Sequence, residues 1–178
     1  MNYIKRIVCL ANSEKHGGRC VAGREITSNW YGPWIRPISS RPSAEVALPE
    51  RRTNNGRAPE LLDVIDITMS APAPAAAQSE NHIIDANVRW VEFGKLGDGE
   101  LLKLVESPAG LWTNGNSSYN GQNDRVTIAQ ASQLNNSLTL IEPDHLSLSV
   151  ETEGKDSIIQ ENESERISPT AMLITFSL

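Results

Sequence analysis

The chain has 178 residues and a mass of 19.5 kDa, enough for one domain or for two very small ones. Two cysteines exclude a disulfide-rich secreted scaffold, and no apolar run approaches the roughly 18 residues of a membrane span. The net charge of −6 is uneven: residues 1–60 carry ten Lys/Arg and five Asp/Glu, whereas residues 61–178 carry six and seventeen. Binding follows local potential, so the acidic total does not exclude a polyanionic ligand. We expect a cytoplasmic protein that does not bind membranes.

Short segments rich in β-branched and apolar residues predict a mainly β protein. The run from Ile7 to Leu10 indicates a first strand that is buried on both faces. A single helix is expected over residues 98–106, where Asp98 can cap the first turn and Pro108 follows the last. Dense Gly/Asn turns between the segments favour a small β-barrel or sandwich. The predicted strands cover residues 3–11, 34–38, 61–69, 88–93, 125–129, 138–141 and 146–150.

The loop after the first strand holds the densest group of polar side chains. Gly17 and Gly18 let backbone amides approach an anion, and Lys15 and Arg19 add positive charge. The pattern lacks the Gly-Lys-Ser/Thr of a P-loop. Two interpretations remain open here, a contact loop for phosphate or nucleic acid and an ordered turn between strands.

Residues 30–41 interleave tryptophan with arginine. Trp34 could stack on a base while Arg36 and Arg41 contact phosphate. The alternatives are a core position for Trp34 and a structural ion pair for Arg36. The charged stretch continues with Glu50, Arg51, Arg52 and Arg57. Such clusters are most often solvated faces, but this is the most basic part of an acidic chain.

Two sets of side chains have residue types that metal binding or catalysis uses. One is Cys9, His16 and Cys20, and the other is Glu80, His82 and Asp85. The first set lacks CxxC spacing and a fourth ligand, so a buried thiol is favoured over a zinc site. The second set has no nucleophile or metal beside it, so a hydrogen-bond network is favoured over acid–base chemistry. We expect no metal, no cofactor and no enzymatic activity.

Four motifs, taken in order, carry a resemblance to a known family. They are KRIVCLANSEKHGGRCVAG, WIRPIS, QSENHIID and LWTNGNSSYNGQNDRV, and together with their spacing they resemble the dual OB domain family of bacterial proteins over about residues 4–145. The resemblance implies two small OB-like barrels and nucleic-acid binding in a bacterial conflict or antiviral defence setting. It implies no catalytic site. The candidate binding residues, with Arg41 added from the residue pattern, are Asn12, Ser13, Lys15, Gly18, Arg19, Trp34, Arg36, Arg41, Asn81, His82, Asn114 and Arg125.

The expected architecture is a small OB-like barrel over about residues 1–75 and a second OB-like unit over 76–150, with one or two short helices. Residues 151–178 form an acidic, divergent tail, and we hypothesise that the second barrel is incomplete through truncation or a change of reading frame near Lys155. The leading prediction is a non-enzymatic module for single-stranded or structured nucleic acid. The alternative is a protein-interaction or sensor subunit that acts beside a separate effector enzyme encoded in the same operon.

Overall fold

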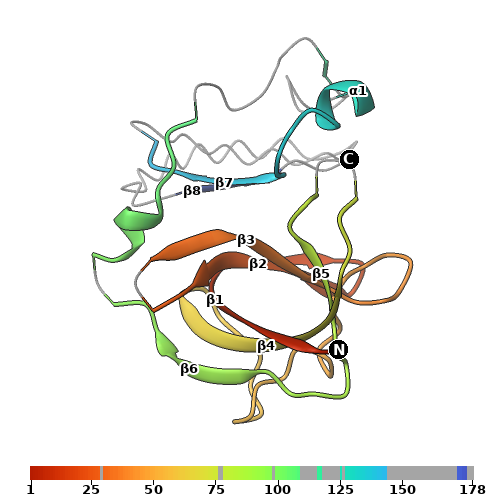
Figure 1. Cartoon of the computed structure of the whole chain (residues 1–178), viewed down its shortest axis with the longest axis vertical. Helices are drawn as coiled ribbons and strands as arrows, with labels where there is room; N and C mark the ends of the chain where they lie inside the picture. Colours follow the sequence, from red (N-terminus) through yellow and green to blue (C-terminus); the bar gives the residue numbers. More distant parts are fainter. Residues whose placement is uncertain are drawn as a thin grey trace, which may run out of the picture.

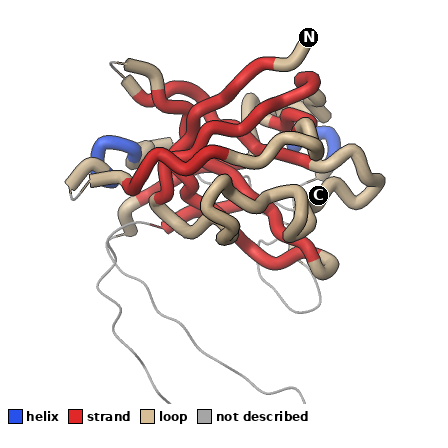
Figure 2. Tube along the Cα trace, turned by 90° about the horizontal axis from the view of Figure 1, so that it is seen from below, coloured by secondary structure: helices blue, strands red, loops and turns tan. Residues whose placement is uncertain are grey.

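The computed structural model describes residues 1–28, 30–75, 78–97, 99–108, 116–117, 125 and 127–143, together with the backbone of Met172–Thr175. The mainly β class is confirmed, and Figure 2 shows the described helices as two short segments at the periphery. One sheet contains β1 (Tyr3–Lys15), β2 (Gly18–Ile26), β3 (Tyr31–Ile38), β4 (Asp63–Pro72), β5 (Asn81–Ile84) and β6 (Val91–Lys95). A separate antiparallel pair contains β7 (Leu138–Ile141) and β8 (Met172–Thr175).

The first five strands close into a barrel with OB topology. Their order is β1-β2-β3-β5-β4, and β4 pairs back onto β1, with Tyr3 opposite Met69. The β3–β5 pairing is parallel, with Arg36 opposite Asn81, and the other pairings are antiparallel. This is the five-stranded barrel of the OB fold. Strand β6 pairs with the first half of β4. The sheet therefore continues past residue 75, where the sequence analysis ended the first unit.

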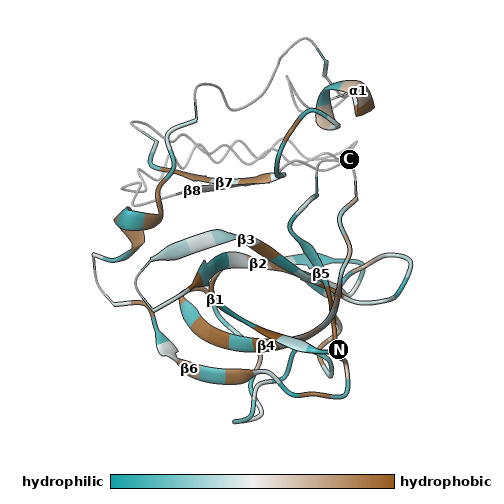
Figure 3. Cartoon of the chain, in the orientation of Figure 1, coloured by the Kyte–Doolittle hydropathy of each residue, from teal (hydrophilic) through white to brown (hydrophobic). Residues whose placement is uncertain are grey.

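Strand β1 lies between two hydrophobic cores because its side chains alternate. Ile7 and Cys9 point into the barrel, where Ile35, Ile65 and Trp90 are also buried. Val8 and Leu10 point outward and pack with a second cluster that contains Ala22, Trp34, Leu104, Leu138 and Leu140. Figure 1 shows β7 lying across β2 and β3, and Figure 3 shows that β7 is largely hydrophobic. The expected two-sided burial of β1 is confirmed. Its cause is that described residues after β6, which we now call the second unit, cover the outer face of the barrel.

Two glycines meet the geometric demands of the β1–β2 hairpin. The β1–β2 hairpin turns through His16 and Gly17, whose φ angles of 46° and 80° match the two-residue turn with both φ angles positive. At Gly23, a Cβ atom would lie 1.9 Å from the Val8 carbonyl oxygen. The strand pair can approach this closely only because Gly23 has no side chain.

Several predicted elements differ from the structure. The described residues 99–106 form no α-helix but a single 3₁₀ turn, η1 (Leu101–Leu104), which follows Glu100. Asp98, the expected cap, lies outside the described residues. The strand prediction for 125–129 is wrong where it reaches Ile128, because α1 (Ile128–Ala131) begins there with a capping box between Thr127 and Gln130. Residues 146–150 lie outside the described part.

The strand predicted at 138–141 is confirmed as β7, and β8 lies in the segment that was expected to be a divergent tail. The acidic segment 151–171 lies outside the described residues. Among the residues that are described, no helix is long and apolar enough to cross a membrane.

Candidate nucleic-acid interface

The structure divides the predicted binding residues between two places. One group belongs to the β1–β2 hairpin and the loop that packs on it: Asn12, Ser13, Lys15, Gly18, Arg19 and Arg41. The other group lies where the barrel meets the second unit: Trp34, Arg36, Asn81 and His82. Arg125 is exposed and donates its backbone N–H to Asn116, whereas Asn114 lies outside the described residues.

The hairpin is fixed to the loop between β3 and β4. Arg19 and Val46 exchange two backbone hydrogen bonds of 3.0 and 2.9 Å. At Gly18, a Cβ atom would lie 2.5 Å from Cγ of Glu45, so the contact requires a residue without a side chain. Asn12 donates from Nδ2 to the Pro59 carbonyl oxygen at 2.7 Å. The hairpin and loop therefore form one rigid end of the barrel.

Arg41 has an internal role in this loop. Its Nη2 donates to Glu50 Oε2 at 2.6 Å and to the Glu45 carbonyl oxygen at 2.7 Å. Glu50 also accepts the backbone N–H of Ala47 at 2.7 Å and the Ser39 hydroxyl at 3.0 Å. The charged groups of Arg41 and Glu50 therefore hold the loop together, and few donors of Arg41 are left to bind a phosphate.

Five other cations at this end have no such partner. They are Lys15, Arg19, Arg51, Arg52 and Arg89, and they define what we call the hairpin-end surface. None of them lies within ion-pair distance of a carboxylate among the described residues. Backbone hydrogen bonds join the segments that carry these cations. The Arg51 N–H donates to the carbonyl oxygen of Ala47, which follows Val46, and the Arg52 carbonyl oxygen accepts the N–H of Trp90, which follows Arg89.

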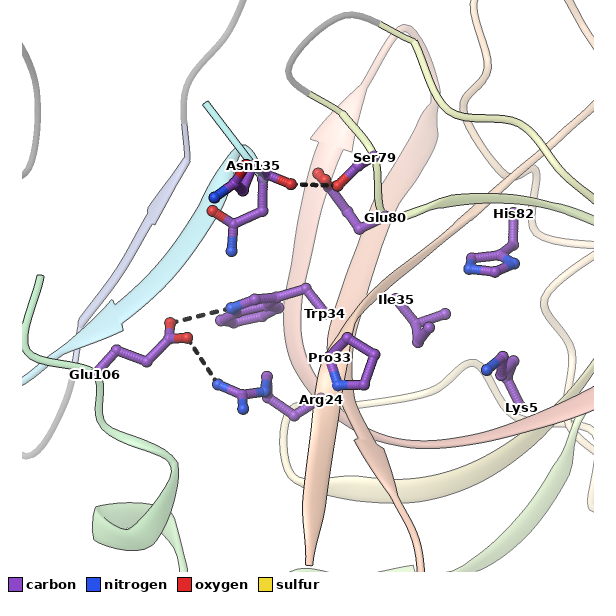
Figure 4. A pocket seen from close by; sticks show the side chains of 11 residues that line it. Lys5, Arg24, Pro33, Trp34, Ile35, Ser79, Glu80, His82, Glu106 and Asn135 are labelled. Atoms are coloured by element: carbon purple, nitrogen blue, oxygen red, sulfur yellow. Dashed lines mark hydrogen bonds and ion pairs between the residues drawn. The ribbon is translucent and has the colours of Figure 1, made fainter. Parts of the chain in front are cut away.

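Two residues of the second group, Trp34 and His82, line a cavity of about 410 Å³ between the β2–β3 face and the second unit (Figure 4). Glu106, which follows η1, projects into it and accepts from Trp34 Nε1 at 3.0 Å and from Arg24 Nη1 at 2.8 Å. Glu106 Oε2 also accepts the N–H of Leu140 at 3.1 Å. Trp34 is only 4% exposed. Its ring belongs to the packed joint between the two units, as the core interpretation expected, and offers no open stacking face.

Arg36 and Asn81 are likewise held by internal partners. Arg36 Nη2 lies 3.1 Å from Glu80 Oε1 and 2.7 Å from the Ser137 hydroxyl, which itself donates to Glu80 at 2.5 Å. Asn81, 4% exposed, donates to Gln78 at 3.1 Å. Arg36 of β3 and Glu80, the residue before β5, therefore form a buried ion pair that reaches Ser137 of the second unit, which is the structural alternative considered for Arg36.

His82 lies at the other side of the cavity (Figure 4). Its Nδ1 is 2.6 Å from the Tyr3 hydroxyl, and the nearby Lys5 pairs with Glu25 at 2.9 Å. Burial lowers the pKa of His82 and the charge of Lys5 lowers it further, while Glu25 acts in the opposite direction. Asp85 accepts from Asn2 and Asn87 rather than from His82.

The Cys9 thiol is buried inside the barrel, and burial raises its pKa to about 12. A thiol in this state is a poor metal ligand and a poor nucleophile. The buried-thiol interpretation is confirmed. Among the described residues, no group of three or more His, Cys, Asp or Glu side chains is arranged to hold a metal ion.

The closed five-stranded barrel agrees with a comparison against protein families. The model of the dual OB-containing domain matches residues 5–172. This chain belongs to that family. The match confirms the resemblance carried by the four motifs, and it extends through the acidic stretch that was expected to depart from the family pattern. No curated protein and no solved structure shows significant similarity to this dual OB chain.

Charge pairing separates the two places on the dual OB barrel. At the cavity, Lys5 and Arg24 each pair with a carboxylate, and the lining residue Glu80 pairs with Arg36, so the field that reaches a phosphate there is largely cancelled. At the hairpin-end surface, none of the five cations forms an ion pair with a carboxylate of the described residues. This surface is therefore the candidate nucleic-acid interface, and the cavity is part of the joint between the units.

The predicted site residues include none of Arg51, Arg52 and Arg89, and no role was predicted for Glu106. Arg51 did stand out as part of a basic stretch, which was the available signal. Arg89 and Glu106 carried no local signal, because their positions depend on contacts with residues far away in the chain.

Proposed function

We propose that this dual OB protein is a non-enzymatic nucleic-acid-binding module whose first barrel contacts the phosphate backbone through the hairpin-end surface. The observation that carries the proposal is the set of unpaired cations at one end of a closed OB barrel. Phosphate contacts by Lys and Arg dominate nucleic-acid affinity because they release counterions. OB barrels commonly hold single strands in a basic groove, so we favour a single-stranded or locally unpaired ligand.

The usual OB binding face is not open in this chain. That face is the outer side of strands 2 and 3. Here it contributes Ala22 and Trp34 to a cluster with Leu138 and Leu140 of the second unit. Binding at this face would expose that cluster, whereas binding at the hairpin end requires no separation of the two units.

The proposal is tested by removing two exposed cations without touching the fold. Arg52 and Arg89 are exposed and pair with no carboxylate in the part of the chain that the structure describes, so the double substitution Arg52→Ala, Arg89→Ala serves as the test variant. Lys95→Ala with Lys103→Ala is the matched control, since both lysines are exposed, lie elsewhere and change the net charge equally. Fluorescence anisotropy would follow labelled DNA and RNA strands of about 12 nucleotides at ~50 mM salt.

The test variant is expected to bind roughly tenfold more weakly for every sequence, with the control within about twofold of the unmodified protein. Absence of binding by the unmodified protein at this salt concentration would overturn the proposal. An equal loss in both variants would show that net charge, not the hairpin-end surface, governs binding.

A second candidate function, protein interaction beside a separate effector, is favoured by one exposed patch. Ile4 and Phe93 are 64% and 59% exposed, and the guanidinium of Arg6 stacks 3.6 Å above the Phe93 ring. Val91, 39% exposed, extends the patch along β6. If this patch is an interface, the product of a neighbouring gene should co-purify after nuclease treatment and be lost in Phe93→Ser. The neighbouring genes also test the defence setting, which stays a prediction from the family.

A further inference from the structure

Arg51 carries a positive charge into the end of the barrel without a compensating partner. The residue is only 8% exposed, and its Nε atom is shut off from solvent with no acceptor within hydrogen-bond distance. No carboxylate of the described residues lies within ion-pair distance of its guanidinium. A buried charge without a partner is strongly unfavourable, so an arginine in this position is unusual unless something supplies the missing negative charge.

A second guanidinium is brought to the same place. Arg19 is held to Val46 by two backbone hydrogen bonds. The next residue, Ala47, accepts the backbone N–H of Arg51, which brings Arg51 back beside this contact. The Arg19 side chain donates to the Asn12 carbonyl oxygen at 3.3 Å and to no carboxylate. Burial lowers the pKa of Arg51, and the charge of Arg19 lowers it further, which is the signature of two like charges in proximity.

The nearest acidic side chain along the hairpin does not resolve this repulsion. Glu14 is the cross-strand neighbour of Arg19, so both side chains lie on one face of the hairpin. Glu14 is exposed and forms no ion pair with any other described residue. The carboxylates of the adjoining loop, Glu45 and Glu50, are engaged by Arg41.

We propose that Arg19 and Arg51 form an oxyanion subsite that binds one phosphate group. A phosphate supplies both the negative charge and the acceptors that the two guanidinium forks lack, and arginine matches phosphate with paired hydrogen bonds. As part of the hairpin-end surface the subsite rests on the function proposed above, where it would hold one phosphate of a bound strand. Inorganic phosphate or the terminal phosphate of a nucleotide presents the same chemistry.

The test uses the full chain and inorganic phosphate in a phosphate-free buffer. Phosphate is expected to raise the Tm by roughly 3–6 °C at tenfold over its Kd, with acetate as the control anion. Arg51→Met should abolish this response and leave the protein at least as stable without phosphate, because an uncompensated charge has been removed. Arg52→Met, one residue away and exposed, should keep the full response. The side-chain Nε–H signals of Arg19 and Arg51 should shift during titration of the unmodified protein.

Other outcomes separate this inference from the proposed function. No Tm change and no signal shift with phosphate, or an equal response in Arg51→Met, overturns the subsite. If a labelled strand binds the unmodified protein and Arg51→Met equally, the nucleic-acid function stands and the subsite is wrong. If phosphate binds and no strand does, the subsite stands as a site for small oxyanions and the nucleic-acid proposal fails.

Discussion

Glu106 is expected to be the strongest single polar contributor to the joint between the barrel and the second unit. Its carboxylate accepts from Arg24 and Trp34 of the barrel and from Thr139 and Leu140 of β7, at 2.8 to 3.1 Å. The substitution Glu106→Ala removes the acceptor for all four donors at once. The Trp34 indole and the Leu140 amide are then left without partners inside the packed interface.

The magnitude follows from these contacts. An unsatisfied buried donor costs about 1–3 kcal/mol, and Glu106→Ala leaves two. The ion pair with Arg24 contributes less, about 0–1 kcal/mol, because the Glu106 side chain is 30% exposed. Water entering the adjoining cavity would offset part of the loss, so we expect the free energy of unfolding to fall by about 2–4 kcal/mol. Glu106→Gln keeps one acceptor oxygen and should lose about half as much.

Urea unfolding measures this change, with hydrogen exchange at the amides of Leu138 and Leu140 as the local readout. Glu142→Ala is the matched control, because Glu142 is an exposed carboxylate close to the same strand and should change stability by no more than about 0.5 kcal/mol. If Glu106→Ala is as mild as this control and β7 exchange is unchanged, the carboxylate does not hold the two units together.

Three further predictions concern single residues. Gly23→Ala should destabilise the barrel by about 3 kcal/mol or more in urea unfolding, since its Cβ would overlap the Val8 carbonyl, and a mild effect would contradict the close approach. The pKa of His82 is lower in the folded protein than in the unfolded chain, so the unfolded chain binds more protons. The stability that this contributes is fully present above about pH 6.5 and is lost as pH falls through the folded-state pKa. His82→Gln should reduce the pH dependence of the free energy of unfolding in this range, and an unchanged pH dependence would refute the prediction. Glu14→Gln should tighten phosphate and strand binding by removing the negative charge opposite Arg19, and calorimetric titration showing weaker binding would contradict that placement.

Local patterns were sufficient where one strand carries its own signal. The four consecutive apolar residues of β1 predicted burial on both faces, and the two hydrophobic clusters account for it. Strand β2 was missed because Arg19, Arg24 and Glu25 interrupt its apolar alternation, although β2 joins β1 through a two-residue turn. The short β5 was missed because its partners, β3 and β4, are set by barrel closure and not by its four residues.

The roles of Trp34 and Arg36 depend on contacts that no local pattern contains. Both residue types are common on nucleic-acid-binding surfaces. Here Trp34 packs with Leu138 and Arg36 binds Ser137, and both partners lie about a hundred residues later in the chain. The capping box at Thr127, in contrast, was readable as Thr followed three residues later by Gln130. The hairpin is an ordered turn, which was one of the two interpretations of this loop, and contact with an anion stays a prediction.

The most direct test of the central claim, that the hairpin-end cations contact phosphates, is the salt dependence of single-strand affinity. The logarithm of the binding constant should fall linearly with the logarithm of salt concentration, by about 0.7 for each phosphate contact. Replacing both Arg52 and Arg89 by alanine should make the slope less negative by about 1.4, with no change for the Lys95 and Lys103 control. An unchanged slope in the Arg52 and Arg89 variant would contradict the account.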